Sequence, residues 1–138
     1  WGIISVNLAR EVKGIDVSLP LGNWYNFDYE HDNREPTYRR TVFTWDFYYS
    51  LVNKANNLID GVEKSALSEV NKKQFLAEGK AIRAFAYYEL LREFAPAYNA
   101  NPDGKGVPIY LLPTTPTTEG QPRASLKDVY ALILEDLN

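Results

Sequence analysis

Residues 75–88 read FLAEGKAIRAFAYY and lie inside a longer helical pattern that runs from about Ser68 to Phe94. Apolar residues fall on most sides of this predicted helix, which indicates packing from more than one direction. Arg83 lies among them, so its guanidinium is expected to pair with a carboxylate or carbonyl, either Glu78 or an acid on another helix. A row of mainly small residues would let a second helix approach closely: Ala77, Ala81, Ala84, Tyr88 and Leu91.

Two more helices are predicted around this one. Apolar spacing predicts a helix over about 44–63, capped by Thr41 or Thr44, with Asn56 on its apolar face and hydrogen-bonded to a neighbouring turn. The last helix is predicted over 125–138, because Ser125 is followed by Asp128 at the spacing of a capping box. Its expected buried face is Leu126, Val129, Tyr130, Ile133 and Leu137.

The other segments carry weaker patterns. Residues 1–13 hold a helical stripe of Ile4, Leu8 and Val12, which Gly14 is expected to end. An aromatic loop is predicted over 14–43, and a connection rich in Pro, Gly and Thr over 95–124, where 107–112 is extended. The alternation of apolar and polar residues that indicates a strand never continues for more than a few residues, so the predicted fold class is all-α. The sequence begins within one helical pattern and stops within another. Residues 1–138 are therefore expected to be a single partial domain of a longer protein.

Composition narrows the function classes. The 138 residues have a net charge of −3 with scattered Lys and Arg, whereas nucleic-acid binding needs a basic patch. The absence of Cys excludes a disulfide framework, a thiolate nucleophile and a zinc finger. Aromatic residues make up 14% of the chain. Most of these rings are expected to fill gaps between helices, and some to face solvent as stacking platforms.

Several motifs, in order, resemble the SusD/RagB-like family over about residues 14–138. Gly79 departs from the alanine-like residue expected at its position. The resemblance implies tetratricopeptide-like helix pairs forming an α–α superhelix with long irregular loops, of which this chain is the N-terminal part. The matching stretches are FTWDFYY (43–49), ANNLI (55–59), residues 75–88, GVPI (106–109), PRAS (122–125), Val129-Tyr130 and Glu135-Asp136-Leu137.

The same resemblance implies a function. Proteins of this kind are non-catalytic lipoproteins on the surface of the outer membrane, anchored through a lipidated Cys that would lie outside this chain. They capture oligosaccharide or polysaccharide and deliver it to a SusC-like TonB-dependent transporter. No cofactor or metal is implied.

The segment NWYNFDY (23–29) is the candidate glycan site. Sugars bind to flat aromatic faces flanked by amides and charges, and this segment offers both on a loop. The resemblance, which is loose in this region, also places a Trp-Tyr stretch here. The alternative is that Trp24 packs the loop onto the helices. The candidate residues are Asn23, Trp24, Tyr25, Asn26 and Tyr29.

Other chemistries are less well supported. His31 lies among acidic residues, but a single imidazole and carboxylates without the spacing of a ligand set favour a solvated acidic loop over a metal site. A glycoside hydrolase needs two carboxylates across a cleft, and the sequence fixes no such spacing for the acids near the loop: Asp16, Asp28, Glu30 and Asp32. The rival binding function is a helical adaptor that binds only proteins, which would not need an exposed Trp24.

Overall fold

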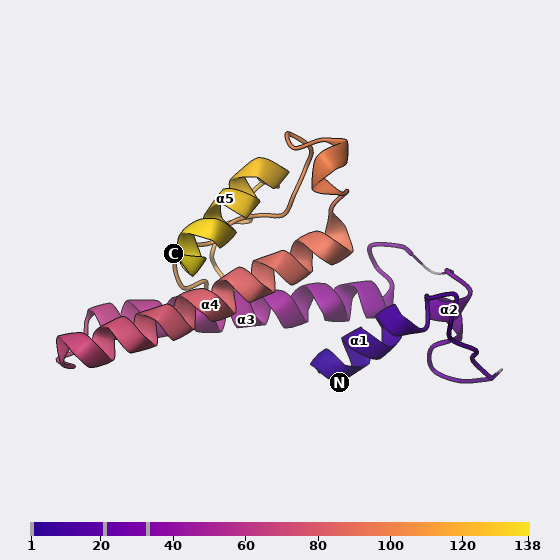
Figure 1. The fold of residues 1–138 in the computed structure, drawn as a ribbon, viewed down its shortest axis with the longest axis horizontal. Coiled ribbons are helices and arrows are strands. Elements are labelled where there is room, and N and C mark those ends of the chain that lie inside the picture. The colour runs from indigo at the N-terminus through magenta and orange to yellow at the C-terminus, as the bar shows by residue number, and fades with distance from the viewer. Residues whose placement is uncertain (1, 21, 33) are drawn as a thin grey trace. The chain divides into compact units, whose positions relative to one another are not determined.

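The computed structural model describes residues 2–20, 22–32 and 34–138 (Figure 1). Its regular secondary structure in these ranges is helical. Within these ranges the only bridge of β type joins Lys105 and Ser125, so the all-α prediction is confirmed. No helix in the described part of the chain has the length and apolar character needed to cross a membrane. In chain order the elements are α1 (Ile3–Glu11), α2 (Asn26–Tyr29), α3 (Arg39–Glu63), α4 (Glu69–Phe94), the 3-10 turn η1 (Tyr98–Ala100) and α5 (Leu126–Leu137).

The chain divides into two compact units, which are Trp1–Phe47 and Tyr48–Asn138. The first contains α1, α2 and the beginning of α3. The second contains the rest of α3, together with α4 and α5. A single partial domain over 1–138 stays a prediction.

In the second unit α3 and α4 pack side by side as an antiparallel helical hairpin. The hydroxyl of Tyr48 donates to Glu89 at 3.3 Å, and farther along α3 the side chain of Ile59 faces Gly79. The α3 residues that are buried here follow the predicted spacing of three and four residues, which confirms this stripe. They are Tyr48, Val52, Ala55, Asn56, Ile59 and Val62.

The start of α3 was predicted wrongly. The helix begins at Arg39 rather than near Thr44, so the predicted loop 14–43 is shorter and also contains α2. Thr44 is therefore inside the helix, where its hydroxyl donates to the Arg40 carbonyl at 2.9 Å instead of capping the N-terminus, and Thr41 is inside it too. The first turn of α3 carries Arg residues and no acidic residue, so the usual signal of a helix N-terminus is missing.

The α4 helix begins as predicted, because the Ser68 hydroxyl accepts a hydrogen bond from the Asn71 amide. The predicted small-residue row is only partly correct: Ala84 and Leu91 are buried, whereas Ala77, Ala81 and Tyr88 are exposed. The close approach between the helices occurs instead at Gly79, which is buried against Ile59. A Cβ atom at Gly79 would lie 2.9 Å from Ile59 Cγ1.

We expect Gly79→Ala to lower the free energy of unfolding by about 1 kcal/mol. Alanine favours a helix over glycine by about 1 kcal/mol, but overpacking a tight contact typically costs about 1–3 kcal/mol. Gly61→Ala is the matched control, because a Cβ atom there meets nothing within 4 Å. Urea unfolding of both variants would check this, and equal stabilisation by the two substitutions would contradict the close contact at Gly79.

The α5 helix packs on α4 and begins at the predicted cap, where the Ser125 hydroxyl accepts from the Asp128 amide at 3.1 Å. Leu137 was predicted to be buried but is 61% exposed, and Tyr130 is only half-buried. Periodicity placed the buried face slightly off: it selected Leu137 instead of Leu132, and it passed over Asp136 because only apolar residues were counted. The buried residues are Leu126, Val129, Leu132, Ile133 and Asp136.

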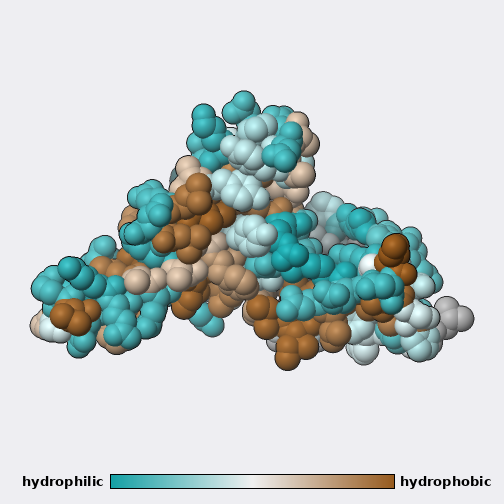
Figure 2. Space-filling model, in the orientation of Figure 1, coloured by the Kyte–Doolittle hydropathy of each residue, from teal (hydrophilic) through white to brown (hydrophobic). Residues whose placement is uncertain are grey.

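In the first unit α1 lies against α2 and ends before Gly14, at Glu11. Its predicted stripe is wrong at two of three positions, because Ile4 and Leu8 are exposed and only Val12 is buried. Val6 and Ala9 are buried instead. Hydrophobic side chains are also visible on the surface in Figure 2, and exposed apolar residues of this kind do not by themselves mark a site.

Candidate functional site

The segment 23–29, called here the aromatic turn, is ordered by its own side chains. Asn23 Oδ1 accepts a hydrogen bond from the Tyr25 amide at 2.8 Å, the arrangement of an Asx turn. Asn26 Oδ1 accepts from the Asn23 amide at 3.4 Å. Both asparagines therefore use their side-chain oxygens to fold the backbone that carries Trp24 and Tyr25.

The second half of the aromatic turn is α2, which ends in a Schellman motif. The Asp32 amide donates to the Phe27 carbonyl at 2.9 Å, and the His31 amide donates to the Asp28 carbonyl at 3.3 Å. His31 has a φ of 60°, the left-handed conformation that this motif requires. Its side chain contacts the Arg34 guanidinium. His31 therefore has a structural position at a helix end.

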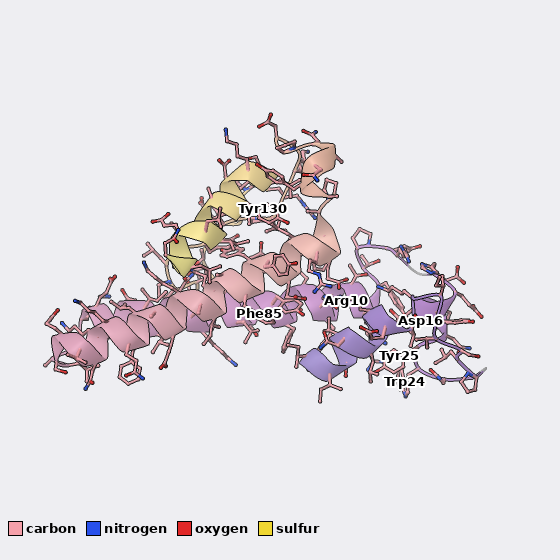
Figure 3. The ribbon with its side chains drawn as sticks, viewed as in Figure 1. Arg10, Asp16, Trp24, Tyr25, Phe85 and Tyr130 are labelled. Atoms are coloured by element: carbon pink, nitrogen blue, oxygen red, sulfur yellow. The ribbon has the colours of Figure 1, made fainter. Side chains whose placement is uncertain are left out.

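The five candidate residues differ in exposure. Trp24 is 69% exposed and Tyr29 is 40% exposed, whereas Tyr25, Asn23 and Asn26 range from half-buried to exposed. The indole of Trp24 thus lies on the surface rather than packing the loop down, and Trp24 and Tyr25 are labelled in Figure 3. An accessible flat ring on an ordered turn can stack on the C–H face of a sugar or on another flat ligand.

Two consecutive arginines of α3 lie over the two consecutive rings of the turn. The Arg39 guanidinium carbon is 5.4 Å from the centroid of the Trp24 ring, and that of Arg40 is 4.8 Å from the Tyr25 ring. Both distances fit cation–π contacts. Arg40 also forms an ion pair with Asp28 at 3.0 Å, in which the two side chains are only 11% and 6% exposed. Neither arginine was predicted from the sequence to belong to this site.

The acids near the turn are placed differently from one another. Asp28 is paired with Arg40 and buried, while Asp16, Glu30 and Asp32 are exposed. Within the described residues, no group of three or more His, Asp or Glu side chains is placed to hold a metal ion.

A second polar group in the other unit, called here the backbone clamp, consists of Tyr49, Asn53, Asn56 and Tyr87. These side chains bond to main-chain atoms of the extended segment 108–114. Asn56 Nδ2 donates to the carbonyls of Tyr110 and Leu112 at 2.9 and 3.1 Å, so its predicted hydrogen bonding is confirmed, although the partners lie in an extended segment and not in a turn. Asn53 bonds both the amide and the carbonyl of Thr114. The Tyr49 hydroxyl donates to the Pro108 carbonyl at 2.7 Å.

Tyr87 completes the clamp by donating to the Tyr110 carbonyl and accepting from the Tyr110 amide, at 3.0 and 2.7 Å. Burial raises the pKa of Tyr87 to about 12, and it also raises the pKa of Tyr49 above its usual value. Both hydroxyls therefore keep their protons at neutral pH and can donate.

Arg83 joins the clamp to α5. Its guanidinium pairs with both oxygens of Asp136 at 2.7 Å and donates to Asn56 Oδ1 at 3.0 Å. Of the two partners predicted for Arg83, the acid on another helix is correct, and Glu78 pairs with Gln74 instead. The hydrogen bonds that Arg83 donates to the Asp136 carboxylate raise the pKa of Arg83 against the opposing effect of burial.

Among the described residues every buried side-chain nitrogen and oxygen has a partner. The clamp and Arg83 are therefore satisfied within the fold and hold it together. The aromatic turn remains the candidate site.

Comparison with known proteins gives one consistent family. Residues 9–138 match the family model SusD-like_3, described as "Starch-binding associating with outer membrane". The chain is 28% identical to SusD-like protein P38 of Formosa agariphila over 112 residues, which cover 80% of this chain and 20% of that protein. It therefore spans only about a fifth of this relative.

Two solved structures have the same fold. A SusD superfamily protein from Bacteroides fragilis gives a TM-score of 0.82 at 29% identity, over 95% of this chain and 31% of that one. A SusD-like carbohydrate binding protein from Bacteroides vulgatus gives a TM-score of 0.84 at 24% identity, over 93% and 27%. These neighbours confirm the prediction of tetratricopeptide-like helix pairs with long irregular loops.

Proposed function

Because the chain belongs to the SusD-like family of starch-binding proteins that associate with the outer membrane, we propose that it takes part in non-catalytic capture of glycans. In this proposal the aromatic turn contacts the ligand, through Trp24 and Tyr25 with help from Asn23, Asn26 and Tyr29. The ligand is an oligosaccharide or polysaccharide, and the starch-binding description of the family makes α-glucans the first candidates.

The exposed indole of Trp24 is the observation that carries this proposal. The ring is 69% exposed, and the side chains of Asn23 and Asn26 order the turn that carries it, so a flat apolar face is held where a ligand can reach it. Stacking contacts of this kind contribute on the order of 1 kcal/mol each, so several of them give a modest affinity that permits release. Binding without covalent chemistry fits a protein that passes its ligand on.

The family supports two further parts of the proposal. The partner is a SusC-like TonB-dependent transporter, which receives the captured glycan. The location is the outer surface of the outer membrane, with a lipid anchor outside this chain. Both would be tested by copurification of the full-length protein with its transporter and by protease accessibility on intact cells.

The alternative of a protein-binding adaptor has one observation in its favour. Three large apolar side chains of α4, Phe75, Ile82 and Phe85, are 36–43% exposed, which would suit a protein partner. Such contacts do not require the aromatic turn, so the two functions are compatible. Substitution of Trp24 separates them, because it affects only glycan binding.

We expect Trp24→Ala to weaken oligosaccharide binding about tenfold, since one well-placed stacking contact is worth about 1.4 kcal/mol at most in this exposed setting. Thermal unfolding should not change, because the indole is on the surface. A glycan array on the full-length protein would select the ligand, with maltoheptaose as the first soluble probe for calorimetric titration.

The control is Phe75→Ala, which removes an exposed ring from α4 outside the aromatic turn. Its affinity should equal that of the wild type. An unchanged titration with Trp24→Ala would remove Trp24 from the site, and equal losses in both variants would contradict a site at the turn.

A further inference from the structure

We infer that Arg40 is a positioning residue, which holds the aromatic turn in the conformation that binds glycan by joining Tyr25 to the buried carboxylate of Asp28. The inference rests on the proposed function, because it concerns the same site. It adds a group outside the aromatic turn, on α3, that controls how well the turn binds.

Arg40 contacts the turn at two residues, Tyr25 and Asp28. Its guanidinium lies over the Tyr25 ring at 4.8 Å, and it reaches Asp28 through two nitrogens, with Nη2 and Nε at 3.0 and 3.2 Å from Oδ2. A planar guanidinium can stack on a ring with its face while its edge donates hydrogen bonds, which a lysine ammonium cannot do. Arg40 therefore fixes Tyr25 relative to α2 as well as to α3.

The Asp28 carboxylate makes this contact specific. Asp28 lies in α2 and is 7% exposed, so the removal of its charged partner would leave a carboxylate uncompensated away from water. The ion pair thus favours one arrangement of α2 against the first turn of α3. A cation in the first turn of a helix opposes the helix dipole, so the benefit of Arg40 comes from Asp28 and Tyr25 and not from α3 itself.

Arg39 extends the arrangement to the second ring. It precedes Arg40 in the sequence and lies over Trp24, but its side chain is exposed. A cation–π contact is weaker in solvent than in a partly buried setting. The buried pair Arg40–Asp28 is therefore expected to determine the conformation of the turn. It also positions Trp24, because Trp24 directly precedes Tyr25 in the chain.

By holding the turn in one conformation, Arg40 would raise the affinity for glycan through preorganisation. When only a fraction of molecules has the binding conformation, the apparent dissociation constant rises by the inverse of that fraction. Loss of Arg40 should thus weaken binding although Trp24 and Tyr25 are both still present. It should also increase the motion of the Trp24 indole in the absence of any ligand.

The test compares Arg40→Gln, Arg40→Lys and Asp28→Asn with the control Arg34→Gln in the full-length protein. Arg34 lies between α2 and α3 and its substitution removes the same charge, but its guanidinium contacts His31 rather than Tyr25 or Trp24. The indole ¹H–¹⁵N signal of Trp24, identified by its loss in Trp24→Phe, reports the order of the turn without ligand. Titration with maltoheptaose reports affinity.

We expect Arg40→Gln and Asp28→Asn to weaken maltoheptaose binding about tenfold, and Arg40→Lys about threefold, with Arg34→Gln at the wild-type value. The Trp24 signal should shift and lose order in the first two variants. A comparable response in Arg34→Gln would show a general charge effect and overturn the inference. So would an unchanged Trp24 signal with unchanged affinity in Arg40→Gln.

The two proposals can fail separately. If Trp24→Ala abolishes binding while Arg40→Gln does not alter it, the proposed function stands and the positioning role is wrong. If the wild type does not bind maltoheptaose, an α-glucan ligand is contradicted, and the ligand-free Trp24 signal still decides the role of Arg40.

Discussion

Arg83→Met should lower the free energy of unfolding by about 3–5 kcal/mol, because it leaves the Asp136 carboxylate buried without its partner. The two side chains are 8% and 2% exposed, so water cannot replace the guanidinium without opening the packing of α5 on α4. Asn56 Oδ1 would lose its donor as well. Urea unfolding followed by far-UV circular dichroism would measure the loss.

The double variant Arg83→Met/Asp136→Leu is the control. Removing both charges leaves no uncompensated carboxylate, so most of the loss should be recovered despite the lower polarity of the site. A matched exposed pair is Lys64–Asp60, where Lys64→Met should change stability by about 0.5 kcal/mol or less. If Arg83→Met had an effect as small as that, the pair would not hold α5 in place.

The sequence predicted those elements whose signals are local. Ser68 and Ser125 marked two helix starts because a side-chain cap is formed within three residues. Arg83 and Asn56 were recognised as needing partners because a polar group in an apolar stripe cannot stay unsatisfied. The identity of the partners, Asp136 and the carbonyls of 110 and 112, depends on long-range packing and was not accessible from spacing.

Errors arose where the hydrophobic pattern was ambiguous. Ile4 and Leu8 were expected inside because they are large and correctly spaced, yet the smaller Val6 and Ala9 face the core. Periodicity defines a stripe on a helix but not which of two stripes meets a neighbour. Gly79 was noted only as a departure from the family, and its role follows from the approach of Ile59, which is a tertiary contact.

The sequence indicated which segment forms the candidate site, but not which residues of other elements contact it. The ring-rich segment 23–29 is conspicuous in the sequence, whereas the guanidinium groups over its rings come from α3, whose start was misplaced. Correct placement of the N-terminus of α3 would have put Arg39 and Arg40 in one helical turn. That alone would not have shown that they meet Trp24 and Tyr25.

Asn56→Ala should lower the free energy of unfolding by about 2–4 kcal/mol, because it leaves several buried groups without partners at once. The carbonyls of Tyr110 and Leu112 would lose their donor, and one nitrogen of Arg83 its acceptor. The extended segment 108–114 should also detach more often from α3. Limited proteolysis within this segment, together with urea unfolding, would measure both effects.

Asn57→Ala is the matched control, since this neighbouring amide is exposed and donates to the carbonyl and Oδ1 of Asn53, one helical turn earlier. Its effect should stay within about 0.5 kcal/mol of the wild type, as for ordinary surface substitutions. Because Asn56 and Arg83 share a hydrogen bond, the two losses should not add in Asn56→Ala/Arg83→Met. Full additivity would mean that the clamp and the ion pair are independent, and that the contact between Arg83 Nη1 and Asn56 Oδ1 contributes nothing to stability.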